Sequence, residues 1–152
     1  MATWAEFEAA APDLAAHGRR LLYARGDGEA LLATVRDDRP PRIHPINVGI
    51  IGSSLYAFLL PSAKRDDLER DGRYAVHAHQ DPAAPDEFMV RGHARLVDDA
   101  ATRQTVAEGW FFTVDDSFHL FELSMEAVVL GLRGPDEWPP RYSTWPGLTS
   151  RT

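Results

Sequence analysis

The sequence predicts a mainly β fold, in which an antiparallel barrel of about six strands is flanked by short helices. Short apolar runs are separated by turn residues, and most of these runs follow one another without an intervening helix. A parallel βαβ sheet would instead alternate strands with helices. At 152 residues, the chain is expected to form one domain, residues 1–152, with enough buried surface for a sizeable core.

The first 27 residues are expected to be an N-terminal helical segment. Thr3 can cap a helix that begins in "WAEFEAAA", and Pro12 opens a second stretch, so residues 3–24 are predicted as helical. Gly18 argues against a single unbroken helix, because glycine costs about 1 kcal/mol relative to alanine in a helix interior.

Short apolar runs bounded by turn residues predict the strands. The run 42–51 and the run 55–60 flank the turn "GSS" and are expected to form a hairpin. Helices are predicted at 62–71 and 98–110, and residues 146–152 are expected to be a loose tail. The segments predicted as strands are 30–36, 42–51, 55–60, 73–79, 87–97, 119–132 and a last short one at 141–145.

Composition and charge exclude several classes of protein. The chain has no cysteine, so it has neither a disulfide framework nor a thiolate nucleophile. No apolar run approaches the ~20 residues that cross a bilayer, and the acidic N-terminus lacks a secretory signal pattern. A net charge of −7 argues against binding of nucleic acid or anionic membranes. We therefore expect a cytoplasmic protein that acts on a small molecule.

Motifs for the common catalytic and metal sites are missing. The sequence has no Gly-rich dinucleotide fingerprint and no phosphate loop that ends in Gly-Lys-Ser/Thr. His77 and His79 share a strand face, but no third ligand accompanies them, so no metal site is predicted. Four Asp-Asp pairs are interpreted as turn and capping residues, at 37–38, 66–67, 98–99 and 115–116.

The stretch "LLPSAKRDDL", residues 59–68, begins a helix in an unusual way. Ser62 is a good N-cap, but Lys64 and Arg65 follow in the first turn, where the helix dipole already places about half a positive charge. Either both side chains extend into water, or the helix N-terminus, Ser62 and Lys64 bind an anion such as phosphate. The stretch alone leaves both interpretations open.

The strand predicted at 42–51 favours the anion. Its side chains alternate, so Arg42 and His44 share a face with apolar residues further along the strand. An arginine fork matches a phosphate dianion. The predicted hairpin would bring Arg42 close to Ser62 and Lys64.

The segment "LLATVRDDRPPRIHPINVGIIGSSLYAFLLPSAKRDDLERDGRYAVHAH" and the later "EFMVRGHARLV" resemble the pyridoxamine 5'-phosphate oxidase-like family of FMN-binding split β-barrels. The small actinobacterial-type members are particularly similar. The match runs from about residue 28 to residue 97, and "RYSTW" echoes the family's C-terminal strand. The resemblance implies a six-stranded split barrel and a homodimer with two FMN sites at the subunit interface.

The resemblance also implies a set of cofactor contacts. It places the FMN phosphate on Arg42, Ser62 and Lys64, and the flavin ring along the strand that follows Arg42. Glu87 and Trp145 would approach from the partner subunit. The remaining contacts that it implies are Ile43, His44, Pro45, Asn47, Ala57 and Phe58.

The chain departs from the oxidases of the family at several positions. Where this chain has Ala63, the oxidases have a second basic residue. They have a lysine where this chain has Asn47, and an amide side chain where it has Glu87. Their C-terminal substrate motif is not visible in "PPRYSTWPG". These departures argue against pyridoxamine phosphate itself as the substrate.

We therefore expect an FMN-dependent oxidoreductase of unidentified substrate and electron acceptor. The cofactor carries the redox chemistry, so no catalytic side chain is assigned. One alternative is a reductase that uses a deazaflavin, for which Arg65, Arg70 and Arg73 would supply part of a basic groove. Others are a flavin- or heme-binding protein without turnover, and a dimeric interaction module that has lost its ligand. Residues 108–118 are expected to form much of the pocket wall, but the sequence does not predict their course.

Overall fold

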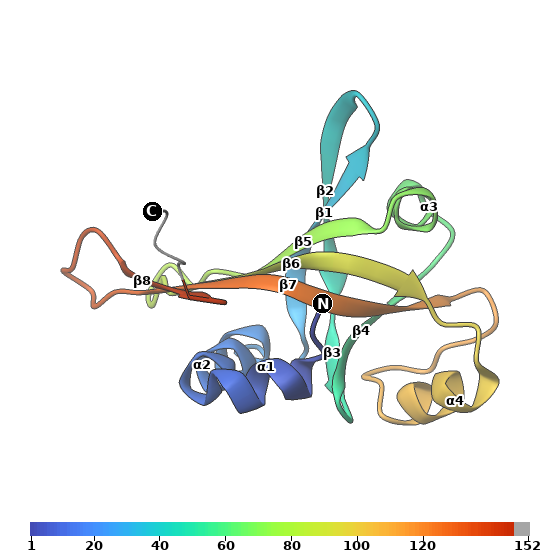
Figure 1. Ribbon diagram of the computed structural model, residues 1–152, viewed down its shortest axis with the longest axis horizontal. Helices are drawn as coiled ribbons and strands as arrows, with labels where there is room; N and C mark the ends of the chain where they lie inside the picture. Colours follow the sequence, from blue (N-terminus) through green and yellow to red (C-terminus); the bar gives the residue numbers. More distant parts are fainter. Residues whose placement is uncertain (148–152) are drawn as a thin grey trace.

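The computed structural model describes residues 1–147 and confirms a mainly β fold (Figure 1). Within these residues eight strands join one curled sheet, whereas a barrel of about six strands was expected and seven segments were predicted as strands. Of the tail expected at 146–152, residues 148–152 lie outside the described part. The strands are β1 (Glu29–Arg36), β2 (Arg39–Asn47), β3 (Gly49–Ile51), β4 (Ser54–Leu59), β5 (Arg73–Ala78), β6 (Glu87–Leu96), β7 (His119–Leu132) and β8 (Arg141–Trp145).

All neighbouring strands run antiparallel, in the order β2-β1-β5-β6-β7-β4-β3. The strand β7 is long enough to pair with β4 along its first residues and with β8 along its last. This double pairing gives the short segment 141–145 a place in the sheet.

The strand predicted at 42–51 is two strands, and the predicted hairpin is wrong for its first half. Asn47 is the last residue of β2 opposite β1, whereas Gly49 already pairs with Tyr56 of β4. Between them, the backbone N–H of Val48 donates to the carbonyl of Gly28 at 2.7 Å. The chain thus leaves one edge of the sheet and joins the other, and this crossing closes the half-barrel.

The N-terminal segment also forms two elements, because the backbone breaks at Ala11 (φ −142°) just before Pro12. Thr3 and Glu6 form a capping box at the first helix. Gly18 is needed for packing, since a Cβ there would lie 2.4 Å from the Phe88 ring. The helices are α1 (Trp4–Ala10), α2 (Pro12–Leu22), α3 (Ala63–Arg70) and α4 (Ala100–Glu108).

Two groups of buried side chains lie on opposite faces of β4, all six residues of which are buried. The larger group fills the half-barrel and includes Ala57 together with residues of α1 and α2. The smaller group packs Phe58 against Val106 of α4 and against Trp110, two residues beyond the end of that helix. The helix α4 therefore covers the outside of the barrel at β4.

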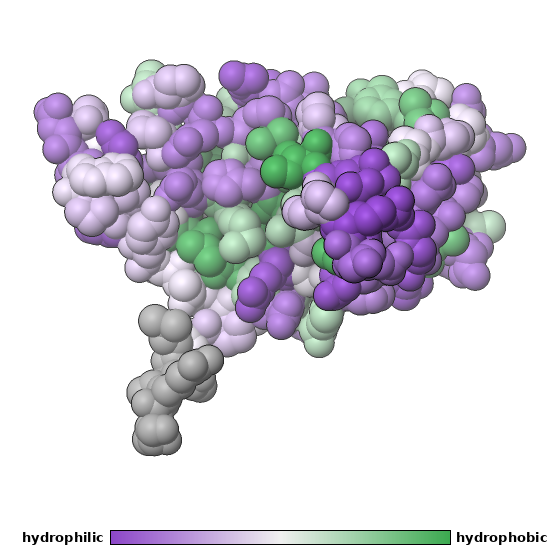
Figure 2. Space-filling view, turned by 90° about the horizontal axis from the view of Figure 1, so that it is seen from above, coloured by the Kyte–Doolittle hydropathy of each residue, from purple (hydrophilic) through white to green (hydrophobic). Residues whose placement is uncertain are grey.

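Elsewhere on the barrel's outside, apolar side chains stay exposed among residues 1–147, because α1 and α2 lie on the other side of the sheet (Figure 1). Hydrophobic residues gather in the middle of the view from above (Figure 2). Ile43 is 67% exposed and Leu31 is 37% exposed. We call this surface the outer face; its apolar side chains are Leu31, Ala33, Ile43, Pro45, Ala75, Met89 and Val129.

No helix in residues 1–147 combines the length and apolar character needed to cross a membrane.

Gly28→Ala is expected to destabilise the protein, because its Cβ would lie 1.8 Å from the Val48 carbonyl oxygen. The backbone must shift to admit the methyl group, and such overpacking costs about 1–3 kcal/mol. Urea unfolding of parent and variant measures the loss. Gly109→Ala is the matched control, since a Cβ there would sit 3.5 Å from Ile51, an ordinary contact. Equal unfolding midpoints for Gly28→Ala and parent would contradict this account of the crossing.

Candidate functional site

The helix α3 begins as the sequence predicts, with Ser62 as its N-cap. Ser62 has an extended backbone, and its side chain accepts from the backbone N–H of Arg65 at 3.4 Å. Its hydroxyl donates to the carbonyl of Leu60 at 2.9 Å. The hydroxyl therefore orders the start of the helix.

The two cations of the first turn have different surroundings. Arg65 Nη1 donates to the Ser117 carbonyl at 2.9 Å, and its Nε lies 3.8 Å from the Glu69 carboxylate. These acceptors offset the cost of placing Arg65 near the positive end of the dipole. Lys64 is half-buried and makes no hydrogen bond or ion pair with any residue in the described range 1–147. Of the two cations in the first turn, Lys64 is thus the one whose charge no acceptor in the described chain offsets.

Asp67, in the next turn of α3, is a buried carboxylate, although the sequence interpretation assigned it a turn or capping role. Only 1% of its surface is exposed. Its Oδ2 accepts from the Thr34 hydroxyl at 2.8 Å and from Arg42 Nε at 2.9 Å, and its Oδ1 accepts from Arg70 at 2.9 Å. Burial alone would raise the pKa of Asp67, but these hydrogen bonds and the two guanidinium charges hold it below its usual value.

Arg42, His44 and Lys64 converge beside this carboxylate. Burial lowers the pKa of His44 most, the charges of Lys64 and Arg42 lower it further, and Asp67 acts in the opposite direction. Geometry supports this grouping, because Arg42 lies on the same side of β2 as His44 and its Nε donates to Asp67 of α3, the helix whose first turn carries Lys64. His44 Nε2 is buried and has no hydrogen-bond partner among the described residues. Two cations and a neutral ring with an unused polar atom suit an anionic ligand.

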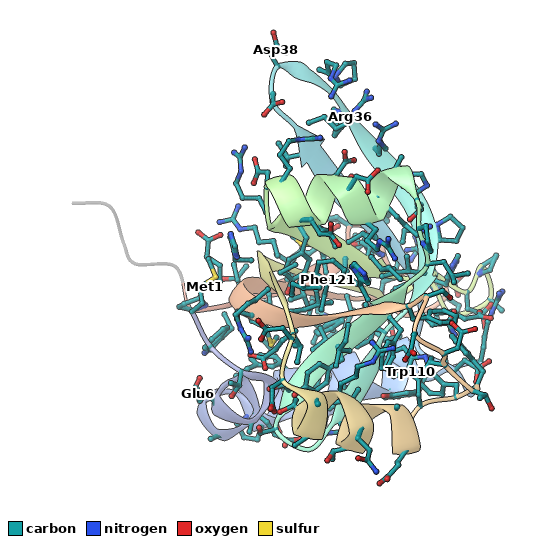
Figure 3. The ribbon with its side chains drawn as sticks, turned by 90° about the vertical axis from the view of Figure 1, so that its right-hand side faces the viewer. Met1, Glu6, Arg36, Asp38, Trp110 and Phe121 are labelled. Carbon is teal, nitrogen blue, oxygen red and sulfur yellow. The ribbon has the colours of Figure 1, made fainter. Side chains whose placement is uncertain are left out.

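The convergence arises from sheet register and not from the predicted hairpin. Arg42 is opposite Thr34 of β1, and α3 packs on β1 and β6. Thr34 and Arg42 both meet Asp67 from the strand side. In Figure 3, α3 lies at the base of the projecting β1–β2 hairpin, whose tip carries the labelled Asp38. Arg42 thus reaches α3, the helix that begins with Ser62 and Lys64, through β1 and its contact with Asp67.

Of the residues implied to contact the flavin ring, three continue along β2. Ile43 and Pro45 are exposed on the outer face, opposite Ala33 and Leu31. Asn47 is half-buried at the end of β2. Alternation thus puts His44 with Arg42 on one side and Ile43 with Pro45 on the other.

The two residues from β4 are enclosed. Ala57 is 1% exposed within the half-barrel, and Phe58 is 5% exposed under α4. The Phe58 ring stacks edge-on against Trp110 at 5.1 Å between centroids, and the Arg103 guanidinium lies over it at 5.2 Å. Within one chain, neither residue therefore presents more than a few per cent of its surface to a ligand.

Glu87 and Trp145 lie apart from Arg42 within one chain. Glu87 starts β6 opposite Gly131, whereas Arg42 is joined through Thr34 and Tyr74 to the other half of β6. Glu87 Oε2 meets no hydrogen-bond criterion among residues 1–147, but the Glu87 carboxylate lies beside the Tyr142 hydroxyl of the same chain and raises the pKa of that tyrosine. Trp145 packs against Phe7 at 5.1 Å between centroids, on the side of α1.

The other sequence candidates are not assembled into sites. His77 lies in β5, but β5 ends at Ala78, before His79. Residues 1–147 contain no group of three or more side chains that could hold a metal ion. Residues 110–114, whose course the sequence did not predict, line a groove beside α4 with Gln104, Ala107 and Glu108.

Thr34 was missed by sequence reasoning, which considered Arg70 only as part of a groove for a deazaflavin. Thr34 did carry a signal, because it is the polar residue at an inward position of "ALLATVR", where Ala30 and Leu32 are also inward. A buried hydroxyl requires a partner, which points to a polar group above β1.

No family model matches the chain, and no curated protein matches it. Solved structures do. A candidate pyridoxamine 5'-phosphate oxidase from Listeria innocua is 19% identical over 72% of this chain and 91% of its own, with a TM-score of 0.57. A NimC/NimA family protein from Clostridium acetobutylicum is 14% identical over 84% and 93%, with a TM-score of 0.61. The heme storage protein HutZ from Vibrio cholerae is 18% identical over 74% and 90%, with a TM-score of 0.60.

The chain has the pyridoxamine 5'-phosphate oxidase-like split-barrel fold. At these identities the likeness concerns the fold, which agrees with the resemblance drawn from the sequence. The split barrel here differs from the expected one in its strand count and in the division of 42–51 into β2 and β3.

The depressed pKa of Asp67 predicts an acid-dependent loss of stability. A carboxyl whose pKa is lower in the folded state stabilises the fold above its unfolded-state pKa of 3.8. That contribution is lost as the pH falls through the lower, folded-state pKa. The free energy of unfolding, measured in urea from pH 7 downward, should therefore fall below about pH 4. The fall should be smaller in Asp67→Asn. Asp66→Asn, an exposed neighbour, should follow the parent; identical curves for Asp67→Asn and parent would contradict the assignment.

Proposed function

We propose that the protein is an FMN-dependent oxidoreductase in which Arg42, Ser62 and Lys64 hold the cofactor phosphate. The observation that carries the proposal is the convergence of Arg42 and the uncompensated Lys64 beside the free Nε2 of His44. The N-terminus of α3 adds backbone N–H groups and a favourable dipole. The resemblance of the sequence and the similar structures support the choice of a flavin among phosphorylated cofactors.

Each residue would have a distinct task. The Lys64 ammonium is a mobile point charge, and the Arg42 guanidinium is a planar donor fork. Ser62 fixes the backbone at the start of α3. His44, neutral because its pKa is lowered, would offer Nε2 as a hydrogen-bonding atom to the ligand. When bound, the flavin would supply hydride chemistry, and the protein would orient it and exclude water.

A second copy of the chain is the proposed partner on the outer face. Monomeric proteins rarely leave a contiguous apolar surface of this kind uncovered. Glu87, which lies away from Arg42 in its own chain, would then be available to the cofactor of the partner.

Heme binding is a second candidate, which the likeness to HutZ suggests and His77 favours. His77 lies on the outer face with its Nδ1 2.7 Å from the carbonyl of Ala78. Since a carbonyl only accepts, Nδ1 of the neutral ring carries the proton and Nε2 keeps its lone pair, as in metal-ligating histidines. No comparable observation favours the deazaflavin, because Arg65, Arg70 and Arg73 are each held by protein acceptors.

Titration of the purified protein with FMN, a deazaflavin and heme in parallel tests the function. We expect saturable FMN binding, which Arg42→Ala and Lys64→Ala each weaken by about 1–3 kcal/mol, the cost of losing a charged hydrogen-bond partner. Arg39→Ala, at the tip of the β1–β2 hairpin, is the matched control for loss of one positive charge. Reduction of the bound flavin by a nicotinamide cofactor would separate an enzyme from a binding protein.

The outcomes distinguish the candidates. Preference for the deazaflavin would keep the site and change the enzyme class, and binding of heme alone would favour the second candidate. FMN affinity unchanged in both variants would overturn the phosphate assignment.

Light scattering on the eluting protein is expected to give a mass near twice 16.9 kDa. Ile43→Asp should shift the protein to the monomer, because burying a carboxylate at an apolar interface carries a large desolvation cost. Ala5→Asp, exposed on α1 across the sheet, should leave the mass unchanged. A parent protein that elutes as a monomer would contradict the proposed interface.

A further inference from the structure

We propose that Asp67 is a positioning residue that aims Arg42 at the ligand phosphate, so that the site selects the phosphorylated flavin over the unphosphorylated one. This inference rests on the proposed function and adds to it a residue and a selectivity that the resemblance did not include.

The Asp67 carboxylate is held rigidly. Both of its oxygens accept hydrogen bonds, from donors on three elements: Thr34 of β1, Arg42 of β2 and Arg70 of α3. The side chain is 2% exposed, so water does not compete for these contacts. A buried carboxylate with three charged or polar donors is a fixed point to which a long side chain can be anchored.

Arg42 is held through one of its three guanidinium nitrogens, Nε. Its Nε donates to Asp67 at 2.9 Å, whereas neither Nη atom has a hydrogen bond to a residue in the described chain, 1–147. Because the guanidinium is planar and rigid, fixing Nε also fixes the directions of the Nη donors. The side chain is 29% exposed, which leaves those donors accessible to a ligand beside Lys64 and His44.

A carboxylate near a phosphate also repels it, and this repulsion opposes the gain in phosphate binding that comes from anchoring Arg42. Anchoring therefore predicts one sign for removal of the Asp67 charge, and repulsion predicts the other. Two guanidinium groups already offset the charge of Asp67, and the Thr34 hydroxyl donates to it as well, so we expect the anchoring effect to exceed the repulsion.

The test compares FMN with riboflavin, which lacks the phosphate, in Asp67→Asn and in the parent. Asparagine keeps the shape and one acceptor but loses the charge that holds Arg42. We expect the Kd for FMN to rise about tenfold, the scale of one charged hydrogen bond, and the Kd for riboflavin to stay unchanged. Asp66→Asn, exposed on the same helix, is the control. In an Arg42→Ala background, Asp67→Asn should cause no further loss, because Asp67 acts through Arg42.

Thr34→Val supplies a second variant if Asp67→Asn does not fold. It removes one anchor of the carboxylate, and we expect a smaller loss of FMN affinity with riboflavin again unchanged. Equal losses of FMN and riboflavin would show a merely structural role. FMN affinity that is not weaker than that of the parent would show that repulsion matches or exceeds the anchoring effect. Either result overturns the inference.

Inorganic phosphate is the probe that separates this inference from the proposed function. If the parent does not bind FMN but phosphate still raises its Tm in a manner that Arg42→Ala abolishes, the proposed function fails. The effect of Asp67→Asn on that Tm shift then tests positioning alone. If neither FMN nor phosphate binds, both proposals fail.

Discussion

The crossing of the chain at Val48 is the constraint on which the rest of the structure depends. It carries the backbone from β2, paired with β1, to β3, paired with β4. The carbonyl of Val48 lies so close to Gly28 that no side chain fits there. Because of this crossing, one continuous segment supplies Arg42 and His44 to the site and Ile50 to the core. The helix α3 follows β4 in the chain and lies against that same segment, where Arg42 donates to Asp67.

Arg65 of α3 and Arg42 of β2 are the same residue type but differ in how many of their donors the protein uses. Arg65 binds backbone carbonyls and the Glu69 carboxylate, so its charge is used within the fold. Arg42 donates from Nε to Asp67, and its two Nη atoms make no hydrogen bond with a described residue. Sequence position alone did not distinguish them, since Arg65 stands in the helix turn where an anion would bind. The distinction comes from what the tertiary structure places within reach of each side chain.

Alternation was the most informative signal in the sequence, because a buried strand constrains every second residue. It predicted the face shared by Arg42 and His44, whereas short apolar runs bounded by turn residues predicted the segments of most strands. The polar run "RDDLER" has no such period, so Asp67 could not be told from its exposed neighbours. The course of residues 108–118 was also not predicted. The carbonyls of Asp115 and Phe118 are held by Arg103, and side chains on backbone carbonyls leave no repeat in the sequence.

The edge position of β2 limits how copies of this protein can associate. An edge strand offers unpaired backbone groups that can recruit a strand from another molecule, which is a route to aggregation. Three of the nine residues of β2 are proline, at 40, 41 and 45, and proline has no N–H to donate. The edge is therefore a poor template for continuous strand addition. Association by stacking of side chains on a face is favoured over growth of an extended intermolecular sheet.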